Sequence, residues 1–144
     1  MKNYFTLLLL IPFLSLCTQE SKEADCSKPT EKSLMAEPSE LSILMNAMYN
    51  VNSEWKKLIE NGEVPINIPK NHIEILTAKS VNERAGSDFY NAMATTYLAK
   101  AKEVTLSNKG NLKTNFNAMI STCISCHEEI CFGPISRIKK LYIK

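Results

Sequence analysis

The sequence has little of what an all-β fold or a nucleic-acid-binding surface requires. Only four of its 144 residues are glycine, and runs rich in valine or threonine are scarce, which counts against an all-β fold. The net charge is only +2, and no dense basic stripe runs through the middle of the chain, so no nucleic-acid partner is expected. A hydrophobic fraction of 44% suits a single globular domain.

Residues 1–16 have the pattern of a signal peptide. Lys2 precedes an apolar run from Phe5 to Leu16, which is too short to span a bilayer. Positions 14–17 read Leu-Ser-Leu-Cys, which resembles the lipobox of bacterial lipoproteins, although Leu16 stands where a small residue is usual. We therefore expect export, to the periplasm or as a membrane-anchored lipoprotein with its lipid on Cys17. A leader cut elsewhere, with Cys17 incidental, is the alternative.

The segment 17–38 is polar and charged, with Pro29 and Pro38 and few large apolar side chains. Such a composition predicts a flexible tether between an anchor and a folded domain. The folded domain is then expected to span residues 39–144.

Three long segments of the remaining chain have apolar residues at three- and four-residue steps, the pattern of amphipathic helices. The stripes comprise Leu41, Leu44, Met45, Met48, Trp55, Leu58 and Ile59; Tyr90, Met93, Ala94, Tyr97, Leu98, Ala101 and Val104; and Leu112, Phe116, Met119, Ile120, Cys123, His127 and Ile130. Ser39 follows a proline at the start of the first segment, Gly62 is its candidate stop, and Ser87 is a candidate N-cap of the second.

One shorter helical segment completes the expected pattern, and a tail follows the last helix. A weak pattern over roughly residues 71–79 predicts a short helix, and residues 135–144 form a short basic amphipathic tail. Four helical segments joined by short loops predict an all-α fold, an antiparallel four-helix bundle.

The last long segment contains Cys123-Ile124-Ser125-Cys126-His127, the C-x-x-C-H sequence of covalent haem attachment. Two thiols must reach the two vinyl groups of the porphyrin while the next side chain reaches the iron. Residues at i, i+3 and i+4 share one helix face, so this spacing serves both purposes. We expect one haem c, with His127 on the iron and its other ring nitrogen on an acceptor such as a backbone carbonyl.

Other interpretations of these cysteines compete with haem. A thioredoxin-like C-x-x-C would sit at a strand-to-helix turn, and no βαβ pattern is present. A zinc site would add Cys131 to the motif, but adjacent Cys126 and His127 fit tetrahedral closure poorly. The cysteines would otherwise be small buried apolar residues. Cys26 and Cys131 are left over from lipid and haem attachment and are candidates for a disulfide.

A C-x-x-C-H on the last helix of a four-helix chain resembles class II c-type cytochromes, the cytochrome c′ family. The resemblance covers roughly residues 39–134, and its only specific motif is the haem site. It implies an antiparallel four-helix bundle with the haem between the first and last helices and His127 as the proximal ligand. Members of the family often dimerise through helix faces, so a homodimer is among the implied states.

In this family the first helix lines the opposite face of the haem, and a methionine there makes the iron six-coordinate. The resemblance implies Met45 as the distal ligand, with Met48, one turn further along the stripe, as the alternative. Methionines at helical spacing are also common core residues, so iron without a sixth side-chain ligand is a third option. His72 follows a proline-bounded loop and is expected at the surface rather than on the iron.

These features favour a one-electron carrier for redox partner proteins, without enzymatic activity. The competing hypothesis is a five-coordinate haem protein that binds or senses nitric oxide or carbon monoxide, with Leu44 or Leu41 over the iron. The family often places a tyrosine and a cation where this chain has Ile130 and Cys131, which puts cation-dependent gas discrimination in doubt. The cations of the tail either guide an acidic partner or form a solvated face; they are Arg137, Lys139, Lys140 and Lys144.

Overall fold

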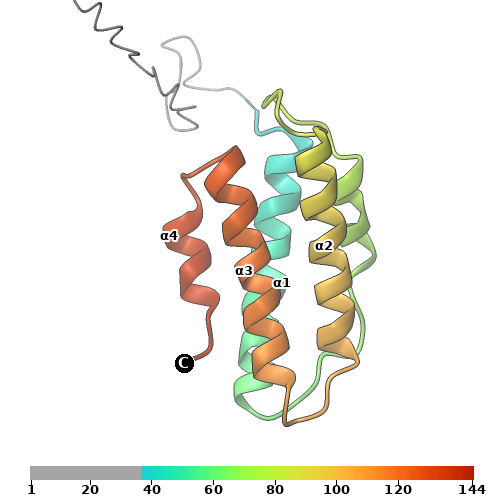
Figure 1. Ribbon diagram of the computed structural model, residues 1–144, viewed down its shortest axis with the longest axis vertical. Coiled ribbons are helices and arrows are strands. Elements are labelled where there is room, and N and C mark those ends of the chain that lie inside the picture. Colours follow the sequence, from blue (N-terminus) through green and yellow to red (C-terminus); the bar gives the residue numbers. More distant parts are fainter. Residues whose placement is uncertain (1–36) are drawn as a thin grey trace, which may run out of the picture.

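The computed structural model describes residues 37–144, and this part of the chain contains helices and no strands (Figure 1). Its long helices are α1 (Glu40–Glu60), α2 (Asp88–Thr105) and α3 (Leu112–Ile130). Shorter elements are the 3-10 helices η1 (Lys70–Leu76) and η2 (Lys139–Leu141) and the α-helix α4 (Ile135–Ile138). The all-α prediction is therefore confirmed for these residues.

Several predictions concern residues outside this range. The signal peptide, the lipidated Cys17, Cys26 and nearly all of the tether lie outside the described residues. Within residues 37–144, no helix is both long and apolar enough to cross a membrane.

The α-helices run in two opposite directions (Figure 1). α1 and α2 run the same way, α3 runs opposite to them, and α4 turns back along α3. The connection between α1 and α2 contains η1, which contacts both helices. The second of the four expected helical segments is thus a seven-residue 3-10 helix and not a long α-helix.

Local sequence signals set the helix boundaries. Ser39 and Ser87 each accept a hydrogen bond at 3.2 Å from the backbone N–H three residues on, as N-cap side chains do. After α1 ends, Gly62 has φ of +79°, a left-handed conformation that only glycine adopts without steric cost. The predicted start, N-cap and stop are therefore confirmed.

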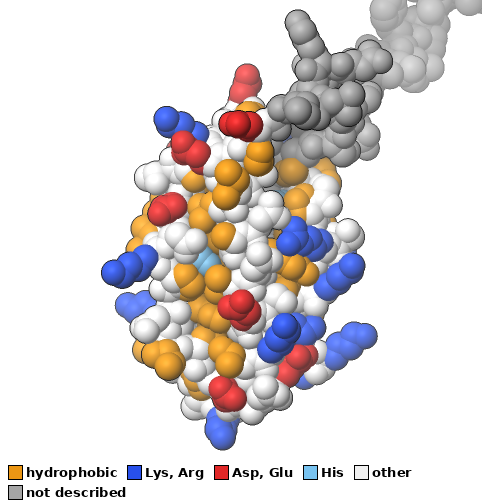
Figure 2. All heavy atoms as spheres, turned by 180° about the vertical axis from the view of Figure 1, so that it is seen from behind, with side chains coloured by type: hydrophobic (Ala, Val, Ile, Leu, Met, Phe, Trp, Pro, Cys, Tyr) orange, Lys and Arg blue, Asp and Glu red, His pale blue; other side chains and the backbone are white. Residues whose placement is uncertain are grey.

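One stripe of α3 forms the centre of the core. Its buried residues recur at three- and four-residue steps, and they pack where α3 meets α1 and α2. They are Leu112, Phe116, Met119, Ile120 and Ile124. On the face seen in Figure 2, apolar side chains gather along the middle, while side chains of both charges are interspersed around them.

A buried polar network joins three elements. The Tyr97 hydroxyl on α2 donates a hydrogen bond to Asn52 Oδ1 on α1 at 3.3 Å and lies 3.1 Å from His72 Nδ1 on η1. Since that hydroxyl has a single proton, His72 Nδ1 must donate to it, which leaves His72 Nε2 as a buried atom without a partner in the described residues. Burial also lowers the pKa of His72, so its ring is neutral at pH 7.

The expectation that His72 lies at the surface is wrong. Its exposed fraction is 0%, because η1 turns the ring inward between α1 and α2. The expectation was based on the proline-bounded loop before His72, but His72 itself belongs to η1, whose packing buries the ring.

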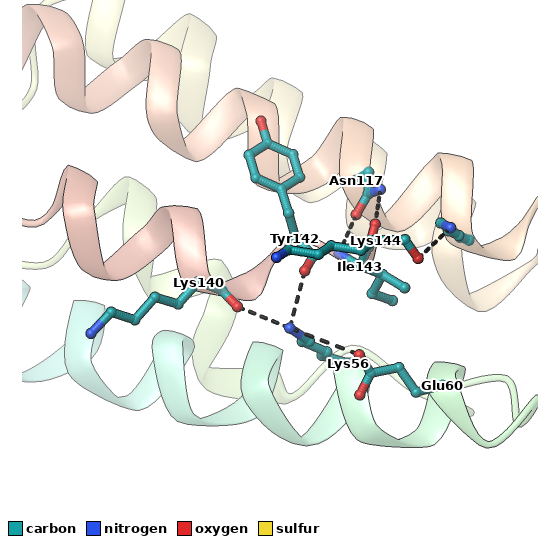
Figure 3. A network of polar contacts seen from close by, with 8 residues as sticks. Lys56, Glu60, Asn117, Lys140, Tyr142, Ile143 and Lys144 are labelled. Carbon is teal, nitrogen blue, oxygen red and sulfur yellow. Dashed lines mark hydrogen bonds and ion pairs between the residues drawn. The ribbon is translucent and has the colours of Figure 1, made fainter.

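The C-terminal tail, residues 135–144, packs back onto α1 and α3 (Figure 3). Lys56 Nζ on α1 donates to the carbonyls of Lys140 and Tyr142, both at 3.0 Å. The Asn117 amide on α3 pairs with the backbone N–H and carbonyl of Ile143 at 3.0 and 2.9 Å. The tail is amphipathic as expected, and its apolar side is buried; the buried residues are Ile138, Leu141 and Ile143.

Replacing Tyr97 by Phe is expected to lower the free energy of unfolding by about 1–3 kcal/mol, because the polar atoms of Asn52 and His72 lose their shared partner inside the core. Urea denaturation of the full chain measures this as a lower midpoint with an unchanged slope. The matched control is Tyr49→Phe, whose hydroxyl takes no part in the network. Equal midpoints for the two variants would contradict the expectation.

Candidate haem-attachment site

The side chains of the C-x-x-C-H motif lie on one face of the C-terminal part of α3. Cys123, Cys126 and His127 are each half-buried, and Cys123 packs against the core cluster. The motif therefore continues the buried stripe toward the C-terminal end of α3. The packing of α3 determines the direction in which the motif points.

Three pockets adjoin this face and share part of their lining. The first, of about 150 Å³, lies between α1, α3 and the C-terminal tail. The second, of about 40 Å³, lies between α1, α2 and α3, and the third, of about 270 Å³, lies between the start of α1, the loop before α2 and the end of α3. Met45 and His127 are the two residues that line all three. Cys123 lines the first and second pockets, and Cys126 lines the second and third.

The structure fixes the orientation of the His127 ring. Its Nδ1 lies 2.9 Å from the carbonyl oxygen of Cys131, and the Cys131 N–H donates to the His127 carbonyl at 3.0 Å. A carbonyl can only accept, so Nδ1 carries the proton and Nε2 is left as the nitrogen with a lone pair. Burial lowers the pKa of His127, although the hydrogen bond to Cys131 opposes this, so the ring is neutral at pH 7. A neutral, oriented imidazole is the form that binds a metal.

The two motif cysteines are thiols and not thiolates at neutral pH. Burial, together with the neighbouring Cys126, raises the pKa of Cys123 to about 12, and its Sγ lies 3.6 Å from the Met119 carbonyl. Burial raises the pKa of Cys126 as well. Redox-active C-x-x-C pairs have lowered pKa values, so this site does not have the electrostatics of a thioredoxin-like centre.

The structure gives no support to the zinc interpretation. Across residues 37–144, no three His, Cys, Asp or Glu side chains gather as ligands of a metal ion. Cys131 contributes its backbone carbonyl to His127 and lines the third pocket, but it does not complete a ligand set.

The candidate distal residues on α1 differ in their positions. Met45 is half-buried and faces every pocket that His127 lines, whereas Met48 is 4% exposed and lines the first and second. Of the two leucines considered for a gas-binding pocket, Leu41 lines the third pocket and Leu44 lines none of the three. His72 lines none of them either.

These residues fit a covalently attached haem. The site offers two thiols and one oriented imidazole on the same helix face, and thioethers from a second helix across adjoining space. The second pocket is lined mainly by apolar and aromatic side chains, among them Ile75, Tyr90, Met93 and Tyr97. This lining has the apolar character that a porphyrin requires, but at about 40 Å³ the second pocket is far smaller than a porphyrin, which would extend into the adjoining first and third pockets.

Sequence reasoning missed several residues around the pockets. Asn52 interrupts the apolar stripe of α1. A polar residue at such a position could have indicated a buried polar contact. Asn46 lines the first pocket and is an exposed polar residue with no distinguishing pattern in the sequence. Arg137 was expected only as a cation of the basic tail, and its place at the first pocket was missed.

Comparison with known proteins adds no relative. No family model, curated protein or solved structure matches this chain. A function for this chain must therefore be argued from the chemistry of the motif and from the geometry around it.

Alkylation of Cys123 in the haem-free full chain is expected to be slow. Its pKa is raised from 9.0 to about 12. At pH 8 the fraction of Cys123 present as thiolate is therefore lower in the folded chain than in the unfolded chain, on the order of a thousandfold, and the rate of alkylation falls with it. Peptide mass spectrometry after timed iodoacetamide treatment, with urea-unfolded chain as control, measures both rates. The folded-chain rate should rise about tenfold per pH unit from pH 8 to 10. A rate that levels off near pH 9 contradicts the raised pKa.

Proposed function

We propose that this chain is an exported c-type cytochrome with one covalently bound haem that transfers single electrons. The observation that carries the proposal is the placement of Cys123, Cys126 and His127 on one face of α3, next to pockets lined by methionines of α1. When bound, the haem supplies an iron centre that accepts and releases one electron.

Each residue of the motif has a distinct role. The thiols of Cys123 and Cys126 would form the thioether bonds to the porphyrin. His127 would bind the iron through Nε2, while the Nδ1–H bond to the Cys131 carbonyl holds the ring in one orientation and raises its basicity. A fixed proximal ligand limits rearrangement when the charge on the iron changes.

Met45 is the preferred distal ligand because it is the α1 methionine that shares all three pockets with His127. A thioether ligand favours the reduced state and fills the position that a gas molecule would otherwise occupy. Met48 is the alternative within the same mechanism. With Met45 absent from the iron, Leu41 at the third pocket would favour the gas-binding alternative.

The arrangement of the helices as a four-helix bundle is part of the same proposal. α1, η1, α2 and α3 would correspond to the four helices of a class II cytochrome, with η1 as a shortened second helix and α3 as the haem-binding helix. Residues 1–16 would direct export, and a lipid on Cys17 with a tether over residues 17–38 would hold the domain at a membrane, where it would meet redox partner proteins.

Absorption spectra of the holo-protein with and without carbon monoxide test the function. We expect a low-spin ferric spectrum with an iron–methionine charge-transfer band, and no response of the ferrous protein to carbon monoxide. Met45→Leu should remove the band and allow carbon monoxide to bind. The matched control is Met48→Leu, which keeps the band. Both swaps preserve volume and cost less than about 1.5 kcal/mol, so folding is retained.

Two results would contradict the ligation of the iron by Met45. A charge-transfer band that survives in Met45→Leu but is lost in Met48→Leu moves the distal ligand to Met48. A high-spin spectrum of the unmodified holo-protein that shifts promptly with carbon monoxide rejects methionine ligation and supports gas binding.

A further inference from the structure

The pockets around His127 contain one charged side chain. Of the residues that line the three pockets, only Arg137 carries a full charge at neutral pH, since His127 is neutral. Arg137 belongs to α4 and lines the first pocket together with Met45 and Cys123. The lysines of the tail, by contrast, line a separate basic groove.

Arg137 is held over the first pocket by two residues of α1. Its guanidinium carbon lies 3.7 Å from the centroid of the Tyr49 ring, in a cation–π contact. Its Nη1 donates a hydrogen bond to Asn46 Oδ1 at 2.7 Å. Both partners also line the first pocket. A guanidinium has five N–H donors, so this arrangement leaves donors for a ligand in the pocket.

The C-terminal tail positions α4 against the bundle. Buried Ile138 and Leu141 lie in the wall of the first pocket, one and four residues after Arg137. Lys56 then holds the carbonyls of Lys140 and Tyr142 (Figure 3). The tail therefore forms one wall of the pocket and presents its arginine at the mouth.

A haem has two carboxylates on the side of the porphyrin away from the vinyl groups. With the vinyl side held by Cys123 and Cys126, these propionates need a cation or water. Arg pairs with carboxylates through two parallel hydrogen bonds, a geometry that lysine cannot reproduce. We propose that Arg137, positioned by Asn46 and Tyr49, binds a haem propionate at the mouth of the first pocket. The inference depends on the proposed function, because it requires the haem.

A paired cation near the iron alters the electron affinity of the centre. Positive charge disfavours the ferric state, so loss of the Arg137 charge should favour oxidation. We expect Arg137→Gln to shift the equilibrium with a fixed redox mediator about threefold to tenfold toward the ferric form; tenfold is about 59 mV for a one-electron couple. The absorption spectrum should stay unchanged, since no axial ligand is altered.

Potentiometric titration at pH 7 of the full holo-protein measures this shift. The matched control is Lys139→Gln, which removes a charge two residues away in the same tail but outside the three pockets. Arg137→Lys keeps the charge and should remain within about twofold of the unmodified protein. Asn46→Ala changes an exposed residue and so leaves the fold intact; it should shift the equilibrium in the same direction as Arg137→Gln but by less.

The outcomes separate the two proposals. If the unmodified chain binds haem but Arg137→Gln and Asn46→Ala both match Lys139→Gln, the Arg137 assignment is wrong and the cytochrome proposal stands. If Arg137→Gln yields no folded holo-protein, Asn46→Ala decides by the same comparison. If the unmodified chain takes up no haem, both proposals are overturned.

Discussion

The burial of one stripe of α3 constrains the rest of the site. Phe116, Met119 and Ile120 are completely buried, so α3 cannot rotate without exposing the largest fully buried apolar side chains. Because a helix fixes the angle between successive residues, burial of that stripe also fixes the direction of the motif, which continues it on the same side of α3. The hydrogen bond from His127 to the Cys131 carbonyl adds a second constraint, where α3 ends.

α1 and the C-terminal tail pack against α3 in different ways. α1 approaches with Met45 and Met48 near the motif and with Asn52 further along, where Tyr97 supplies the partner that a buried amide needs. The C-terminal tail covers the side of α1 and α3 that α2 and η1 do not cover. The fully buried side chains of α3 thus coexist with three adjoining pockets at the motif.

The sequence predicts the features that depend on neighbouring residues. Helix periodicity, Ser87 and Gly62 act within one or two turns, and the relation of Cys123, Cys126 and His127 follows from helix geometry alone. The burial of His72 could not be predicted in the same way, because it depends on Tyr97, 25 residues away, and on η1 as a 3-10 helix. The placement of Arg137 depends on how the tail packs, which local pattern does not specify.

Covalent attachment of haem to Cys123 and Cys126 is tested most directly by the intact mass of the chain in denaturant, after maturation in a host that attaches haem c. A covalent cofactor survives unfolding, whereas a ligand held only by the folded pockets is lost. We expect the mass of one haem added to the chain, located by peptide mapping on the segment with Cys123 and Cys126. A chain with no added haem in such a host contradicts the account.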